Sequence, residues 1–112
     1  LIDQNVSWDE GAFVDFFGRP ASTTTGLAAL ALQTGAAVIP LFIIRLEDGT
    51  YKIIIYEEVA VTKTNDHEAD LFENTQRFTC IIEDVVRKYP DQYFWLHQRW
   101  KTKKTQMPVD RQ

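Results

Sequence analysis

The stretch FFGRPASTTTG, Phe16 to Gly26, has residue types that could bind an anionic group. It follows a short apolar run and precedes an apolar helical pattern, and the start of a helix offers free backbone N–H groups to an anion. Gly18 allows a ligand close to the backbone, and Arg19 could hold a phosphate or carboxylate through two parallel hydrogen bonds. The hydroxyls of Ser22–Thr25 could add contacts. A plain strand–helix turn with a redundant cap explains the same residues, and composition alone leaves both interpretations open.

Other reactive side chains are sparse. Cys80 lies on an amphipathic segment, where a buried or half-buried structural thiol is expected rather than a nucleophile. His67 lies near a helix start and is expected to be exposed, whereas His97 suits a structural hydrogen bond. The paired carboxylates Glu57 and Glu58 end a strand pattern, which favours two solvated charges. No phosphate-binding loop of the Gly-x4-Gly-Lys-Ser/Thr type is present.

The elements that would position the anion-binding stretch are strands and helices in alternation. Strands are predicted over Ala12–Phe17, Ala36–Leu46 and Tyr51–Val61, and helices over Thr24–Thr34 and Glu68–Tyr89. A strand–helix–strand crossover followed by a hairpin at Asp48-Gly49 predicts one mixed sheet with flanking helices, an α/β fold. The continuous apolar run of the second strand is typical of a strand covered on both faces, and its Pro40 marks a bulge or a strand end.

Composition narrows the class of protein. The 112 residues fit one domain or a piece of one, and the net charge of −4 argues against nucleic acid as a partner. A single cysteine excludes an intrachain disulfide, and no apolar run reaches the roughly 18 residues of a membrane span. The chain begins with Leu1, so we expect it to be cut from something longer. Its end, Tyr93 to Lys104, gathers aromatics and cations; we expect Trp95 in the core, and Trp100 either in the core or at a bilayer interface.

Three blocks of the chain, in order, resemble the lipid A biosynthesis acyltransferase family. These are lauroyl- and myristoyl-type enzymes that transfer a fatty acyl chain from acyl carrier protein to a lipid A precursor. The resemblance extends from Asp3 to Lys101, and the one departure noted is Tyr93, where the family usually has Trp. The blocks are Phe16-Phe17-Gly18 with Ala21 and Thr24; Gly35-Ala36 with Pro40 and Arg45; and Pro90-x-Gln92-Tyr93-x-Trp95-x-His97-x-Arg99-Trp100-Lys101.

The resemblance implies a reaction that needs a catalytic base, and the motif that supplies this base in the family is not found in residues 1–112. In the family a His followed five residues later by Asp or Glu takes the proton of the acceptor hydroxyl. In this sequence Phe72 stands five residues after His67, and Thr102 stands five after His97. The resemblance therefore implies that residues 1–112 are the C-terminal part of an acyltransferase domain with a glycerol-phosphate-acyltransferase-like fold. The catalytic dyad and a membrane anchor would precede Leu1, so no catalytic residue, metal or cofactor is expected in this chain.

The resemblance also supplies candidate substrate contacts and partners. Beside the active site, the stretch from Phe16 would help to hold either the glucosamine phosphates of the acceptor or the phosphopantetheine arm of the donor. The parent would act at the cytoplasmic face of the bacterial inner membrane, on acyl carrier protein thioester and a lipid A precursor, and the isolated part is expected to self-associate. The alternative is a small non-catalytic α/β module that binds an anionic lipid or a protein. The candidate substrate-binding residues are Asp3, Gln4, Gly18, Arg19, Thr24 and Arg45, the last being equally explained as a strand-end cation in solvent.

Overall fold

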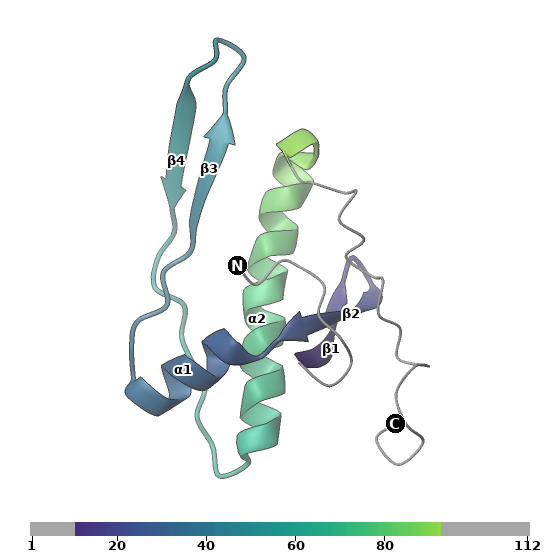
Figure 1. Ribbon diagram of the computed structural model, residues 1–112, viewed down its shortest axis with the longest axis vertical. Coiled ribbons are helices and arrows are strands. Elements are labelled where there is room, and N and C mark those ends of the chain that lie inside the picture. The colour runs from purple at the N-terminus through teal and green to yellow at the C-terminus, as the bar shows by residue number, and fades with distance from the viewer. Residues whose placement is uncertain (1–10, 93–112) are drawn as a thin grey trace.

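The computed structural model describes residues 11–92 as two β-hairpins, two α-helices and a short 3₁₀ helix, with the longer α-helix between the two hairpins (Figure 1). The mixed α/β class is confirmed. In chain order the elements are β1 (Gly11–Phe16), β2 (Arg19–Thr24), α1 (Gly26–Thr34), β3 (Leu41–Arg45), β4 (Tyr51–Ile55), α2 (His67–Lys88) and the short 3₁₀ helix η1 (Pro90–Gln92).

The prediction of one mixed sheet with a crossover is wrong for the part of the chain that the structure describes. Its strands form two separate antiparallel pairs, β1 with β2 and β3 with β4. The Arg19–Thr24 segment, expected to be a loop, is the missed strand β2, which pairs back onto β1 from Phe16 opposite Arg19 to Gly11 opposite Thr24. Proline has no N–H and cannot donate to a strand ladder. Pro20 is tolerated in β2 because it lies opposite Asp15, at a register position where the backbone nitrogen faces away from β1.

The second hairpin is shorter than predicted, mainly at the end away from its turn: β4 begins at Tyr51 as predicted but ends at Ile55. β3 begins at Leu41, directly after Pro40, so the proline marks a strand end as expected. Beyond the two strands, an isolated bridge joins Val38 to Val59. The turn forms at Asp48-Gly49: the Asp48 carboxylate accepts from the Thr50 amide (3.0 Å) and hydroxyl (2.6 Å), and these bonds hold the pKa of Asp48 below its ordinary value. Gly49 supplies the positive φ of 86°.

Both helices form where the apolar spacing predicts them. α1 ends at Gly35, whose left-handed backbone (φ 71°) lets its N–H bond to the carbonyl of Ala31 at 2.9 Å. α2 begins after Asp66, whose side chain caps the amide of Ala69 at 3.1 Å. In Figure 1 α2 runs through the middle of the molecule, and the two hairpins lie on either side of it. The β1–β2 hairpin packs its buried residues Phe16 and Ala21 against Val86 of α2.

A buried polar cluster fixes the segment that leads into α2. Asn74, fully buried, accepts from the Thr62 amide (2.9 Å) and donates to the Thr62 carbonyl (2.8 Å) and to the Asp70 carbonyl (2.8 Å). Asp70 accepts from the amide and hydroxyl of Thr64, both at 2.8 Å. The Thr64 amide bond is the main reason that the pKa of Asp70 lies below its ordinary value. Two short side chains thus pair the backbone of a segment without regular structure.

Replacing Asn74 by Ala should destabilise the chain by about 2–4 kcal/mol, because both backbone groups of the partly buried Thr62 would lose their partner. Chemical denaturation followed by circular dichroism measures the change. Glu73→Ala is the matched control on the same helix: its side chain is 55% exposed, and its ion pair with Arg77 (3.3 Å) should contribute below about 1 kcal/mol. An equal loss in both variants would contradict this role for Asn74.

Candidate functional site

The turn of the first hairpin is made of two residues with left-handed backbones. Phe17 (φ 53°) and Gly18 (φ 74°) join Phe16 to Arg19. These two residues form the pair of the β1–β2 ladder that lies next to the turn. Two successive positive φ values give the turn whose twist matches a tight hairpin. Gly18 adopts this conformation without strain, whereas a side chain such as that of Phe17 makes it unfavourable by roughly 1–2 kcal/mol. The surroundings of Phe17 must therefore stabilise the turn.

Contacts from α2 supply that stabilisation. The Phe17 amide donates to the carboxylate of Glu83. Arg87, one helical turn further on, pairs with Glu83 at 2.6 Å and places its guanidinium 4.9 Å from the centre of the Phe17 ring. The Phe16 ring meets the Phe17 ring edge-on, with centroids 4.8 Å apart. The tip of the hairpin is thus held to one side of α2 by its backbone and by its ring.

A second contact fixes the same hairpin two residues earlier. The side-chain amide of Gln76 accepts from the Asp15 N–H (2.7 Å) and donates to the Asp15 carbonyl (2.9 Å), as a neighbouring strand would. Gln76 and Glu83 lie seven residues apart on α2, so two points of the helix hold Asp15 and Phe17 of the hairpin. These two contacts fix the backbone of the hairpin tip, and therefore the position of Arg19, which follows the turn directly.

The structure separates the predicted contacts at the start of the chain. Gly18 and the exposed Arg19 lie at one end of β2, and Thr24 lies at the other, roughly 20 Å away along six extended residues. Thr24 accepts from the Gly26 amide at 3.2 Å, at the start of α1. The expectation that the Gly18–Arg19 turn adjoins a helix N-terminus is therefore wrong: a strand intervenes. Ser22 and Thr23, also expected at an anion, are buried within β2.

Arg45 lies on a different hairpin from Arg19. It is exposed at the end of β3, and its backbone is held by the side-chain amide of Gln92, which accepts from the Arg45 N–H (3.2 Å) and donates to its carbonyl (3.1 Å). Arg45 is thus an exposed cation at the end of a strand, a position that fits both interpretations offered for it. Asp3 and Gln4, and likewise Trp95, His97 and Trp100, fall outside the described residues.

Sequence reasoning missed the part that α2 plays at the turn. Arg87 adds a second guanidinium beside the turn, with its side chain 57% exposed, while Glu83 is only 15% exposed. The signal was available, because Glu83 and Arg87 have the i,i+4 spacing of a helical ion pair. What the spacing does not indicate is that a hairpin tip lies against the pair.

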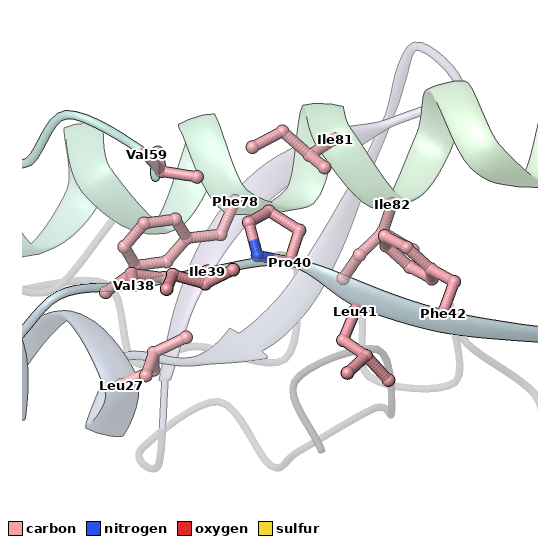
Figure 2. A pocket seen from close by; sticks show the side chains of 10 residues that line it. All are labelled: Leu27, Val38, Ile39, Pro40, Leu41, Phe42, Val59, Phe78, Ile81 and Ile82. Carbon is pink, nitrogen blue, oxygen red and sulfur yellow. The ribbon is translucent and has the colours of Figure 1, made fainter. Parts of the chain in front are cut away.

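An apolar pocket, also not predicted, lies between α1, α2 and the segment that enters β3. Figure 2 shows Leu27 of α1 on one side and Phe78 and Ile82 of α2 on the other, with Pro40 between them. The pocket has a volume of about 270 Å³ and no charged residue in its lining. A hollow of this chemistry suits an alkyl group. Its lining consists of Leu27, Val38, Ile39, Pro40, Leu41, Phe42, Val59, Phe78, Ile81 and Ile82.

The other candidate residues named from the sequence are exposed side chains outside the turn and the pocket. Cys80 is exposed, which corrects the expected burial, and it accepts weakly from Gln76 at 3.5 Å. His67 is the exposed first residue of α2, and Glu57 and Glu58 are exposed, as predicted. Within residues 11–92 no three His, Cys, Asp or Glu side chains gather as they would around a metal ion. None of the helices in this range combines the length and apolarity needed to cross a bilayer.

Comparison with known proteins gives one consistent family. The sequence profile described as bacterial lipid A biosynthesis acyltransferase matches residues 1–102. The lipid A biosynthesis palmitoleoyltransferase of Escherichia coli K12 is 30% identical over 103 residues, which is 90% of this chain and 32% of the relative. The lauroyltransferase of the same strain is 32% identical over 108 residues (95% of this chain, 34% of the relative), and its myristoyltransferase is 31% identical over 105 (93% and 31%).

The chain therefore spans about a third of the length of these relatives. Their names differ in the acyl group, and their identities to this chain lie within two percentage points of one another, so the similarity does not favour one acyl group. The family match covers almost all of the chain, including every element from β1 to η1. The chain belongs to the bacterial lipid A biosynthesis acyltransferase family.

Proposed function

We propose that this chain forms part of an acyltransferase that moves a fatty acyl group from acyl carrier protein to a hydroxyl of a lipid A precursor or a similar glycolipid. The observation that carries the proposal is the family match over residues 1–102. The chain contributes substrate contacts rather than the catalytic base, because neither His67 nor His97 is followed five residues later by a carboxylate. Residues 1–112 correspond, in this proposal, to the C-terminal part of the enzyme domain.

The Gly18–Arg19 turn is the proposed contact for an anionic part of a substrate. Arg19 is exposed and directly follows a turn that α2 holds in place, so the backbone that carries its guanidinium is already positioned for a phosphate. The nearby guanidinium of Arg87 is paired with Glu83 at 2.6 Å, so Arg19 is the cation at the turn that the proposal assigns to the anion. The anion is either an acceptor phosphate or the phosphopantetheine arm of the donor. Asp3, Gln4, Thr24 and Arg45 stay proposed contacts, with Thr24 and Arg45 on other parts of the surface.

The apolar pocket is the proposed seat for part of an alkyl chain. Its lining offers only apolar side chains from three separate elements, and neither phosphate nor sugar would find a hydrogen-bond partner among those side chains. Such a substrate also explains why the parent enzyme would work at a membrane surface, which we place at the cytoplasmic face of the inner membrane. The alternative, a non-catalytic module for anionic lipid, would use the same turn without turnover.

A chimera tests the proposed function. The 103-residue segment of the Escherichia coli palmitoleoyltransferase that aligns with this chain would be replaced by the corresponding residues of this chain. We expect the chimera to acylate a lipid A precursor from an acyl carrier protein thioester, with product detected by mass spectrometry. A folded chimera that binds acceptor but transfers no acyl group would favour the non-catalytic module instead.

A further inference from the structure

Glu83 of α2 is a largely shielded carboxylate whose two oxygens have different partners. Oε1 accepts from the Phe17 N–H at the tip of the first hairpin, and Oε2 pairs with Nη1 of Arg87 at 2.6 Å. The side chain of Glu83 is 15% exposed, whereas that of Arg87 is 57% exposed. Hydrogen bonds to a charged acceptor are stronger than neutral ones, and they strengthen further where water is kept away. Glu83 is therefore a firm anchor for the backbone of the turn.

The Phe17 N–H lies at a position that needs such an acceptor. The β1–β2 ladder ends at the pair of Phe16 and Arg19, so Phe17 and Gly18 lie beyond it at the tip. A backbone donor outside the ladder must find its partner in a side chain or in water. Phe17 is also the only residue other than glycine with a positive φ (53°) within residues 11–92. Glu83 thus contacts the backbone at a residue whose left-handed conformation is unfavourable by itself.

Arg87 closes a ring of three contacts around the turn. The Phe17 N–H donates to Glu83, Glu83 pairs with Arg87, and the guanidinium of Arg87 lies 4.9 Å from the centre of the Phe17 ring. The arginine orients the carboxylate, and the aromatic ring orients the arginine. Phe17 is therefore held through both its backbone and its side chain by two residues that lie one helical turn apart on α2.

A second glutamate–arginine pair on α2 shows that this arrangement is not a general property of the spacing. Glu73 and Arg77 are also four residues apart and pair at 3.3 Å. Glu73 is 55% exposed, and in this pair it is the arginine that reaches the neighbouring segment, at the Ala60 carbonyl and the Thr62 hydroxyl. At Glu83 it is the carboxylate that reaches the neighbouring element. Glu73 therefore supplies a matched control for substitutions at Glu83.

We propose that Glu83 is a positioning residue for the anion site at the Gly18–Arg19 turn and acts through the Phe17 N–H. The left-handed Phe17 makes the tight turn that sets Arg19 opposite Phe16. For a residue other than glycine this conformation is disfavoured by a factor of roughly 5–30. Without Glu83 the competent turn is less populated, and the apparent affinity for the anion falls with that population. The inference rests on the proposed function, because it concerns the site that Arg19 forms.

NMR spectroscopy of the 112-residue chain tests the structural step without any substrate. A residue with a left-handed backbone gives a strong NOE between its own amide and Hα protons, and we expect this NOE at Phe17. Glu83→Ala should weaken it, whereas Glu83→Gln keeps an acceptor oxygen and should preserve it. Glu73→Ala removes the other ion pair and should leave the NOE unchanged. An undiminished NOE in a folded Glu83→Ala chain would overturn the proposal.

Kinetics of the chimera test the consequence for substrate binding. Glu83→Ala should raise, by about fivefold or more, the KM of the same substrate whose KM rises in Arg19→Ala. In a chimera that already carries Arg19→Ala, adding Glu83→Ala should not raise that KM further, because Glu83 acts through Arg19. Phe17→Asn creates an Asn-Gly turn that adopts positive φ readily, so the effect of Glu83→Ala should shrink in that background. A residue that only supports the fold would have the same effect with and without Arg19.

The outcomes separate this inference from the proposed function. If Arg19→Ala raises KM and Glu83→Ala does not, Arg19 binds the anion but Glu83 has no positioning role. If the two effects multiply in the double variant, Glu83 acts through general stability, and the inference is rejected. If Arg19→Ala changes no kinetic constant while Glu83→Ala still weakens the NOE, α2 positions a turn that binds no substrate. That result would reject the anion site together with the role of Glu83 in it.

Discussion

The 112-residue chain, incubated alone with an acyl carrier protein thioester and a lipid A precursor, should give no acylated product above a control without protein. A sugar hydroxyl attacks a thioester poorly until a base takes its proton, and loss of a positioned base alone lowers a rate by about 10²–10⁴. The residues at the required spacing from the two histidines are Phe72 and Thr102, neither of which can orient an imidazole as a carboxylate does. Loss of the surfaces that align both substrates would lower the rate further.

The chimera described above is the positive control for this experiment. If the chain alone is inactive and the chimera is active, the chain supplies substrate contacts and the remainder of the enzyme supplies the base. Product from the chain alone that disappears in the His97→Ala variant would contradict the expectation and would make His97 the base. Product that persists in both His67→Ala and His97→Ala would indicate a different mechanism.

The helices and the second hairpin could be predicted because their signals are local. Apolar spacing, the Gly35 cap and the Asp48-Gly49 turn each act within a few residues. The helices formed close to their predicted ends, whereas the strands of the hairpin formed only in the part nearest the turn. β2 was missed because its sequence, RPASTT, has one buried apolar residue, Ala21, and contains Pro20. Its pairing depends on the Phe17-Gly18 turn, and Phe17 adopts positive φ only with support from Glu83, which lies 66 residues away.

The candidate site was predictable in composition but not in geometry. Reading Gly18, Arg19 and Thr24 as one loop placed them together at a helix start, whereas β2 carries Thr24 to the far end of the strand. The contacts from Gln76 and Gln92, which pair with strand backbones as a neighbouring strand would, leave no local pattern because glutamine is common on exposed helix faces. Long-range side-chain to backbone pairing therefore decides where Arg19 and Arg45 lie.

Replacing Arg19 by Ala in the chimera should lower kcat/KM at least about tenfold, because a charge-assisted contact contributes roughly 1.5–3 kcal/mol. The substrate whose KM rises identifies the anion: the lipid A precursor if Arg19 binds an acceptor phosphate, and the acyl carrier protein thioester if it binds the phosphopantetheine arm. Arg19→Lys should recover part of the loss, since it keeps the charge but not the two parallel hydrogen bonds.

Lys52→Ala controls for the loss of a surface cation, because Lys52 is exposed on β4 and far along the chain from the turn. It should leave kcat/KM unchanged for both substrates. A second control separates contact from positioning: Glu83→Gln keeps an oxygen that can accept from the Phe17 amide but removes the ion pair with Arg87. Its effect should be smaller than that of Arg19→Ala if the guanidinium of Arg19 itself meets the anion. If Arg19→Ala leaves both KM values and kcat unchanged in a folded chimera, Arg19 has no place in the substrate site, and the turn is a structural feature of the hairpin.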